Sequence, residues 1–383
     1  MDTRKAVAGL RRFVKKLVAD GATDRDAYRG WKQDEKNEAF MARCLGYTRA
    51  EGMASVTALV QPFFHPELPL IGLNYTNTAH VTLHNFGEAG WTPGVRLCRG
   101  IVFDHTGRVV AFPFPKFFNY GEHLETRSLP SEPFVATTKQ DGHLGIIFEY
   151  GGSLHITTRG SFLSNTSLIA TEMLAPYQAR WKKALPKSVC PLVEIIDPET
   201  EVLTDYQGWT GFILIGAFNR RTYKDFDYAE QQSLAKRLGI EVTSRWEGNS
   251  IAELIELMKD LTVQNQEGFV ARFQSGLRVK FKFATYIGRM IGEKLNVRYV
   301  MRRLMDDTLQ KRVGDLPAEI QGEADRIKEL VLRVKTVAGS RKDRWAYLYA
   351  LETDEEQCND TYKALCRSFQ AWLVRTGQLP AVK

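Results

Sequence analysis

The spacing of hydrophobic and polar positions changes twice along the chain. Near the N-terminus, apolar residues recur at helical spacing: Val7, Leu10, Phe13, Val14, Leu17 and Val18. This spacing predicts a helix that ends near Gly21. Its opposite face is basic, which favours a solvated surface over a nucleic-acid contact, because charged side chains mostly stay in water.

From about Leu68 to Phe283 the pattern consists of short β-rich runs separated by Gly, Pro and Asn. The runs are residues 100–103, 144–150, 154–158, 192–196, 212–217, 268–273 and 277–283. Turn sequences join several neighbours, as at residues 150–153 and 274–276, so we expect mostly antiparallel strands. Residues 163–185 and 228–238 are expected to be helices. Together these elements predict an α+β domain.

After Phe283 the pattern is almost wholly helical, over residues 286–305, 318–337 and 343–373. We therefore predict an N-terminal α+β domain over residues 1–285, with residues 1–67 as a helical extension within it. An all-helical C-terminal domain is predicted over residues 286–383. Two domains agree with the chain length of 383 residues.

Composition narrows the class of protein. No apolar run approaches the roughly 20 residues that span a bilayer, which predicts no membrane association. Five scattered cysteines without a CxxC pair argue against a disulfide framework, so we expect a reduced, cytoplasmic protein. The net charge is +7, and residues 278–345 carry 17 Lys and Arg against 9 Asp and Glu. This basic region is either a phosphate-contacting surface or a set of solvated helix faces.

The strongest chemical signal is Lys139, in the sequence Lys-Gln-Asp-Gly between a β-prone run and a strand. A lysine becomes a nucleophile when burial or neighbouring cations deprotonate it. Lys280 and Lys282 alternate along one predicted strand, which places both ammonium groups on the same face. Taken alone, Lys139 would be interpreted as an exposed turn lysine.

Seven short motifs follow one another in a fixed order. They are Arg-Gly-Ile-Val-Phe from Arg99, Pro-Lys-Phe-Phe-Asn-Tyr with Lys116, the Lys139 motif, Arg-Gly-Ser from Arg159, Val-Glu-Ile with Glu194, Glu-Gly-Phe-Val from Glu267, and Val-Lys-Phe-Lys with Lys280 and Lys282. The ordered set resembles the covalent nucleotidyltransferase superfamily of ligases and capping enzymes. The first two motifs, and residues 192–207 with their Glu-Ile-Ile-Asp-Pro and Asp-Tyr-Gln, are most similar to the bacteriophage RNA ligase 1 family.

The resemblance implies an adenylyltransferase domain in which Lys139 carries AMP. It also implies catalytic roles for Asp141, Lys280 and Lys282, and a metal ligand at Glu267. ATP-binding roles are implied for Arg99, Lys116, Gly142, Arg159, Glu194 and Val270. His143 stands where relatives often have Ser, which removes a hydroxyl contact from that position.

The implied activity is ATP-dependent joining of RNA 5′-phosphate and 3′-hydroxyl ends through lysyl-AMP and RNA-adenylate intermediates, in RNA or tRNA repair. The implied cofactors are ATP and Mg²⁺, with Mn²⁺ as an alternative metal, and a nicked tRNA is one candidate substrate. The helical C-terminal domain would then select the RNA. Three alternatives remain open: an mRNA capping guanylyltransferase, a DNA ligase, and a catalytically silent RNA-binding relative.

The sequence does not support two other kinds of site, a phosphate-binding loop and a zinc site. No GxxxxGK[ST] phosphate-binding loop is present. His80 and His84 stand four residues apart, but the segment is predicted to be extended and has no HExxH glutamate, so it does not predict a zinc site.

Overall fold

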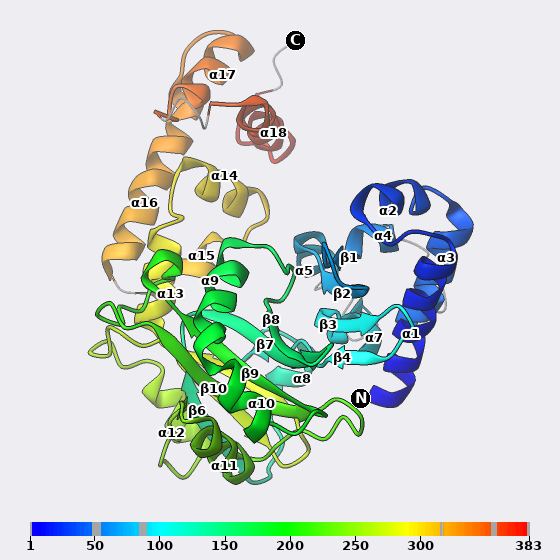
Figure 1. Ribbon diagram of the computed structural model, residues 1–383. Helices are drawn as coiled ribbons and strands as arrows, with labels where there is room; N and C mark the ends of the chain where they lie inside the picture. The colour runs from blue at the N-terminus through cyan, green and yellow to red at the C-terminus, as the bar shows by residue number, and fades with distance from the viewer. Residues whose placement is uncertain are drawn as a thin grey trace. The chain divides into compact units, whose positions relative to one another are not determined.

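The computed structural model contains two compact units (Figure 1). The structure describes residues 2–47, 55–83, 90–314, 316, 318–353 and 358–380. The first unit comprises Met1–Gly248 and Glu267–Phe281, and the second comprises Asn249–Gln266 and Lys282–Lys383. Residues 249–266 thus group with the C-terminal helices, whereas the division after residue 285 stays a prediction.

The first unit begins with helices α1 (Thr3–Ala19), α2 (Arg25–Trp31), α3 (Glu35–Leu45) and α4 (Val56–Leu59). Asp2 caps α1 by accepting a hydrogen bond from the Lys5 amide at 3.0 Å. The predicted apolar face is buried, with Leu10, Phe13 and Leu17 fully inaccessible to solvent. The prediction of an N-terminal helix is therefore confirmed.

The first sheet has the order β1-β2-β3-β4 and is antiparallel throughout. Its strands are Val60–Phe64, Leu70–Tyr75, Arg99–Asp104 and Val109–Ala111. Helices α5 (Asn77–Leu83) and α7 (Pro93–Leu97) connect β2 to β3. The extended conformation predicted around His80 is wrong, because His80 lies within α5; His84 falls outside the described residues. The Thr76 side chain caps the N-terminus of α5, because its hydroxyl oxygen accepts a hydrogen bond from the Ala79 amide.

Two further sheets complete the first unit. One has the order β11-β10-β9-β7-β8, and the other has the order β5-β13-β12-β6. Their strands, from β5 to β13, are Phe118–Asn119, Phe134–Lys139, His143–Tyr150, Ser153–Thr157, Val189–Ile196, Gly211–Asn219, Glu241–Val242, Gly268–Phe273 and Arg278–Lys282. The pairs β9–β10, β6–β12, β7–β8 and β7–β9 are antiparallel, whereas β10–β11 and β5–β13 are parallel. The predicted class, a mostly antiparallel α+β fold, is confirmed.

Helices pack against the five-stranded sheet and bury a hydrophobic core between themselves and the sheet. Helices α9 (Asn165–Leu174) and α10 (Gln178–Ala184) lie against β8, and α11 (Tyr228–Leu238) lies against β10 (Figure 1). Trp181 is fully buried in this core, and its indole N–H donates to the Leu238 carbonyl at 2.7 Å. The short helix α8 (Leu124–Arg127) follows β5.

The second unit is helical in its described residues. Its helices are α12 (Ile251–Leu257), α13 (Ala284–Gly292), α14 (Val297–Met305), α15 (Leu309–Val313), α16 (Ala318–Leu332), α17 (Arg341–Tyr349) and α18 (Asp360–Arg375). Val300, Val331, Leu348 and Phe369 form part of its own core. The predicted helical C-terminal region is confirmed. Among the described residues, no helix combines the length and apolar character that crossing a bilayer requires.

Candidate active site

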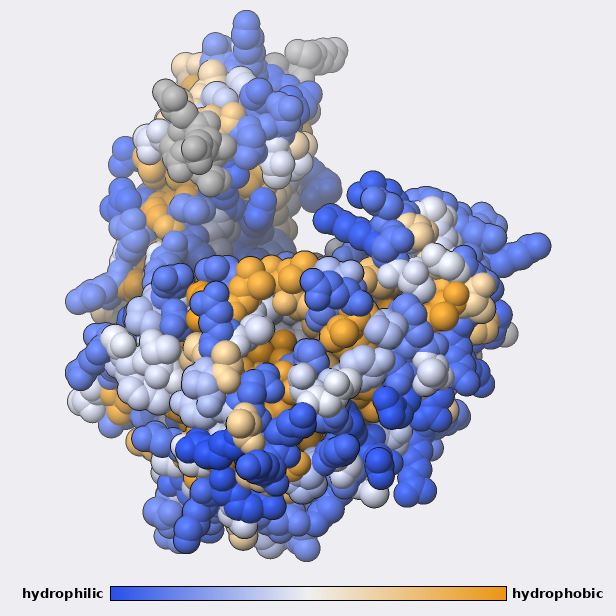
Figure 2. Space-filling view, viewed as in Figure 1, coloured by the Kyte–Doolittle hydropathy of each residue, from blue (hydrophilic) through white to orange (hydrophobic). Residues whose placement is uncertain are grey.

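The first unit contains a cavity of about 610 Å³ where the sheets meet the loops that follow β6 and β8. This volume lies within the range of small-molecule sites. Figure 2 shows hydrophobic surface gathered in the middle of the visible face and bordered by hydrophilic residues. Seven of the predicted site residues line the cavity: Arg99, Lys139, Gly142, Arg159, Glu194, Val270 and Lys280. Four others, Lys116, Asp141, Glu267 and Lys282, do not border the part of the cavity formed by described residues.

Lys139 is the last residue of β6, and it pairs with Gly268 at the start of β12. This register brings its ammonium nitrogen Nζ to 2.5 Å from Oε2 of Glu267, the residue just before β12. The Lys139 side chain is 20% exposed to the cavity, whereas that of Glu267 is only 3% exposed. The ion pair therefore holds the amine at the cavity wall, and as an ammonium ion it has no lone pair with which to attack.

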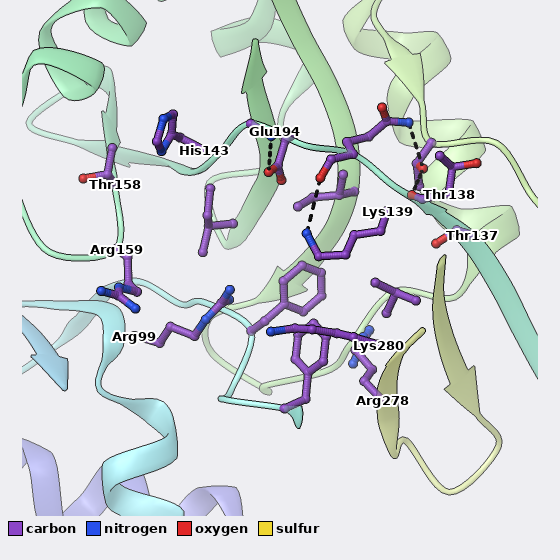
Figure 3. Close-up of a pocket in the computed structure, with 18 of the residues that line it drawn as sticks. Arg99, Thr137, Thr138, Lys139, His143, Thr158, Arg159, Glu194, Arg278 and Lys280 are labelled. Carbon is purple, nitrogen blue, oxygen red and sulfur yellow. Dashed lines mark hydrogen bonds between the residues drawn. The ribbon is translucent and has the colours of Figure 1, made fainter. Parts of the chain in front are cut away.

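Glu194 lies on the five-stranded sheet and contacts the turn that follows Lys139. It lies on β9, and its Oε1 accepts a hydrogen bond from the Gly142 amide at 3.1 Å. Burial raises its pKa to about 7; Lys139 acts in the opposite direction, and Glu267 adds to the rise. Position 142 requires glycine, because a Cβ there would lie 2.4 Å from the Ile195 carbonyl oxygen. This close approach sets Glu194 beside Lys139, as Figure 3 shows.

The Asp141 carboxylate binds the backbone of a neighbouring loop. Its Oδ2 accepts hydrogen bonds from the amides of Leu203 and Thr204, at 3.0 and 2.8 Å. The side chain is 5% exposed. Asp141 therefore ties the loop between β9 and β10 to the Lys139 turn, and its catalytic role stays a prediction.

Three cationic side chains surround the ring of Tyr75. The Arg159 guanidinium carbon lies 4.9 Å and the Lys116 Nζ 5.9 Å from the ring centroid, and Arg159 Nη1 donates to the tyrosine oxygen at 3.3 Å. Burial alone would raise the pKa of Tyr75, but Arg99, Lys116 and Arg159 outweigh it and lower that pKa. In the described part of the chain, none of the three cations forms an ion pair with a carboxylate. A cluster of this kind attracts anions.

Two buried polar atoms in this cluster lack hydrogen-bond partners: Nη1 of Arg99 and Oδ1 of Asn74. Burial, the largest cause, lowers the pKa of Arg99, and nearby Arg159 acts in the same direction. Burial also lowers the pKa of Lys116, which is 6% exposed. Unsatisfied groups of this kind are rare unless water or a ligand completes them. The unpartnered donor of Arg99, together with the other cations, is therefore suited to an anionic ligand, whereas the Asn74 oxygen would accept from a hydrogen-bond donor.

Strand β13 supplies the remaining wall of the cavity. Its burial alternates as predicted, with Phe281 inside and Lys280 and Lys282 less buried. Lys280 Nζ lies 4.8 Å from the centroid of the Phe117 ring and borders the cavity (Figure 3). Lys282 belongs to the second unit, where its Nζ lies 5.1 Å from the centroid of the Tyr286 ring.

Several cavity residues were not predicted from sequence. Arg278 lines the cavity next to Lys280 and pairs with Asp225, which also binds Arg272 at 2.7 Å. The alternation of β13 could have revealed Arg278, because it lies two residues before Lys280 on the same face. Asn74 also lines the cavity, and it and the adjacent Tyr75 come from β2, outside every recognised motif, so nothing in the sequence pattern indicated them.

The carboxylates fit a divalent cation only in part. Among the described residues no group of three or more His, Cys, Asp or Glu side chains could hold a metal by itself. Glu267 and Glu194 are nevertheless close enough for Glu267 to raise the pKa of Glu194. Mg²⁺ typically takes one or two protein carboxylates and completes its shell with phosphate oxygens and water. The pair therefore suits a metal that arrives with a phosphate ligand.

Comparison with known proteins identifies the region that holds this site. Residues 97–286 match the RNA ligase family model. The resemblance expected from the ordered motifs is thereby confirmed for these residues.

Two curated relatives match part of the chain. A putative RNA ligase of Thermovibrio ammonificans is 31% identical over 188 residues, covering 47% of this chain and 48% of the relative. RNA ligase 1 of bacteriophage TS2126 is 31% identical over 142 residues, covering 30% of this chain and 32% of the relative. The chain thus spans about half or less of the length of these relatives.

Two solved structures that resemble this chain are less similar to it in sequence than the two curated relatives. An archaeal ATP-dependent RNA ligase is 16% identical, with a TM-score of 0.47 over 84% of this chain and 85% of that one. A Naegleria gruberi RNA ligase is 20% identical, with a TM-score of 0.33 over 40% of this chain and 50% of that one.

Proposed function

We propose that this protein is an ATP-dependent RNA ligase that joins 5′-phosphate and 3′-hydroxyl ends, in RNA or tRNA repair. The observation that supports it most is the position of Lys139, whose amine faces a nucleotide-sized cavity opposite an anion-attracting cluster. Deprotonated Lys139 would attack the α-phosphate of ATP, forming an N–P bond as the bond to pyrophosphate breaks. A 5′-phosphate oxygen of RNA would then take the AMP from Lys139. The RNA 3′-hydroxyl would finally displace AMP and form the phosphodiester bond.

The cationic side chains suit the charge that develops during the first step. Arg99, Lys116 and Arg159 would hold the departing pyrophosphate, since guanidinium groups bind phosphate through two parallel hydrogen bonds. Lys280, next to the Lys139 side of the cavity, would stabilise charge on the α-phosphate. Lys282, the last residue of β13, would likewise stabilise charge on the α-phosphate.

The polar and apolar walls suit the nucleoside. Glu194 would accept hydrogen bonds from ribose hydroxyls, and its contact with the Gly142 amide fixes its orientation. Val270 lines the cavity from β12 and would contact the adenine ring.

Glu267 is the proposed ligand for Mg²⁺ or Mn²⁺. A bound cation would supply charge neutralisation for the phosphates. Glu267 currently binds the Lys139 ammonium. A cation that competes for this carboxylate would release the Lys139 amine from the ion pair.

The second unit offers a basic groove that would contact RNA and select the substrate. Arg341, Lys342, Trp345, Arg367 and Gln370 line a hollow of about 480 Å³ between α17 and α18. Arg341, Lys342 and Arg367 form no ion pair in the described part of the chain, and the Trp345 indole N–H is buried without a partner. Cations beside an aromatic ring are typical of single-stranded nucleic-acid sites. We place the protein in the cytoplasm, where such RNA would be encountered.

A sealing assay tests the proposal. The protein should circularise or join a 5′-phosphorylated RNA with ATP and Mg²⁺, and should leave the same RNA with a 5′-hydroxyl unchanged. Lys139→Ala should abolish sealing, whereas Lys182→Ala, an exposed lysine on α10, should not. Parallel reactions with GTP and with DNA separate RNA ligase from capping enzyme and DNA ligase. RNA binding without sealing under any of these conditions would indicate the silent relative instead.

A further inference from the structure

The Asp-Tyr-Gln motif in the loop between β9 and β10 places Tyr206 against the turn that contains Lys139. The Tyr206 hydroxyl accepts a hydrogen bond from the Asp141 amide at 2.8 Å and donates one to Oε1 of Gln140 at 3.2 Å. Tyr206 does not border the nucleotide-sized cavity in the described structure, so it contacts the turn and not the space available to a substrate.

The hydrogen bonds continue from Gln140 to the other side of Lys139. Gln140 Nε2 donates to the Thr243 hydroxyl at 3.4 Å, and that hydroxyl donates to the Thr138 carbonyl at 2.6 Å. Thr243 itself is 1% exposed. The residues before and after Lys139 are therefore joined by one chain of side-chain hydrogen bonds.

Tyr206 is the only link in this path that comes from the β9–β10 loop. Burial raises its pKa to about 12, so the phenol stays neutral and keeps its proton at any ordinary assay pH. Its two hydrogen bonds fix the backbone at 141 and the side chain at 140 at the same time. Gln140 and Asp141 directly follow Lys139, so these hydrogen bonds restrain the backbone next to the residue that carries the amine.

We propose that Tyr206 is a positioning residue that, through Gln140 and the Asp141 amide, aligns Lys139 for attack on the α-phosphate of the nucleotide. The proposal rests on the proposed function and adds to it a residue outside the cavity. Displacement of a nucleophile by about 1 Å can cost about 100-fold in rate, so loss of one hydroxyl here can have a large kinetic effect.

The test compares Tyr206→Phe with Tyr47→Phe in the whole chain of 383 residues. Tyr47 is a matched control, because its hydroxyl donates one buried hydrogen bond, to the Gly90 carbonyl at 2.7 Å, away from the cavity. Two readouts are measured: the rate of AMP transfer to Lys139, and the rate at which acetic anhydride labels Lys139, by peptide mass spectrometry. The second readout needs no enzymatic activity.

Tyr206→Phe should slow AMP transfer about 10-fold or more. It should also speed the labelling of Lys139, because the amine is no longer held against Glu267. The labelling of buried Lys116 and the thermal midpoint should match those of Tyr47→Phe. Rates like those of Tyr47→Phe in both readouts, or labelling of Lys116 that rises with that of Lys139, would overturn the proposal.

A second variant tests the route through Gln140. In a Gln140→Met background, Tyr206→Phe should cost little further, because residues in one hydrogen-bond network are not additive. Full additivity would contradict this route. If the wild-type protein transfers AMP to no lysine, the proposed function fails, and the labelling rates alone still decide whether Tyr206 positions Lys139.

Discussion

Replacement of Glu194 by glutamine should make the stability of the protein less dependent on pH. The carboxyl group is 8% exposed, and burial raises its pKa from the ordinary 4.5 to about 7. Below pH 4.5 the group is protonated in both the folded and the unfolded chain. Between pH 4.5 and pH 7 only the unfolded chain releases the proton, so the folded state loses stability as the pH rises.

The size of this loss follows from the difference in pKa. Each pKa unit is worth about 1.4 kcal/mol, so the full effect is about 3 kcal/mol, and most of it develops between pH 5 and pH 8. Glu194→Gln keeps a carbonyl oxygen that can accept the Gly142 hydrogen bond but has no proton to lose. Relative to the wild type, its free energy of unfolding should therefore rise by about 2 to 3 kcal/mol between pH 5 and pH 8.

Urea unfolding followed by tryptophan fluorescence measures this difference at both pH values. Glu241→Gln, at an exposed position of β11, is the control, and its effect should stay within about 0.5 kcal/mol at each pH. The reasoning is refuted if the difference between Glu194→Gln and the wild type is the same at pH 5 and pH 8.

The remaining predictions concern the phosphates and the RNA. Glu267→Gln should slow AMP transfer about 100-fold or more, with partial recovery at high Mg²⁺ concentration, in a radiolabel-transfer assay; a normal rate at low Mg²⁺ would remove the metal role. Lys280→Ala and Lys282→Ala should each lower the single-turnover rate of AMP transfer by about 100-fold, and an unaffected Lys282→Ala would exclude that residue from the site. The pair Arg341→Glu and Lys342→Glu should leave AMP transfer unchanged and weaken RNA binding. In that pair, the slope of log affinity against log salt should become shallower by about 0.7 for each lost phosphate contact, measured by filter binding; an unchanged slope would show that the groove does not contact RNA.

The local elements of the fold follow closely from the sequence where the start and stop signals are strong. The helix predicted at residues 228–238 matches α11 because Asp227 and Glu230 form a capping box and Gly239 ends the helix in a left-handed conformation. The strand predicted at residues 268–273 matches β12 for a similar reason, since a turn with Gly276 at positive φ follows it. Such signals act within a few residues and need no knowledge of the rest of the chain.

The sequence did not predict which distant segments of the chain lie next to one another in the folded protein. His80 lies in a helix although its neighbours alternate like a strand, and a Thr76 hydroxyl at the helix start decides between the two. The motifs indicated Lys139 and Glu267 separately, but only the register of β6 against β12 brings their charged atoms to 2.5 Å. Tyr75 lies on β2, outside every recognised motif, and the Asp-Tyr-Gln motif marked Tyr206 without indicating that its hydroxyl contacts the Lys139 turn.

The most direct measurement of the central claim is the site of covalent AMP attachment. The purified protein is incubated with ATP labelled at the α-phosphate and with Mg²⁺, digested at neutral pH, and analysed by peptide mass spectrometry. We expect one acid-labile adduct, on Lys139, that is absent from Lys139→Ala and is not formed with GTP. A label that persists in Lys139→Ala, or that is attached to another residue, would contradict the account.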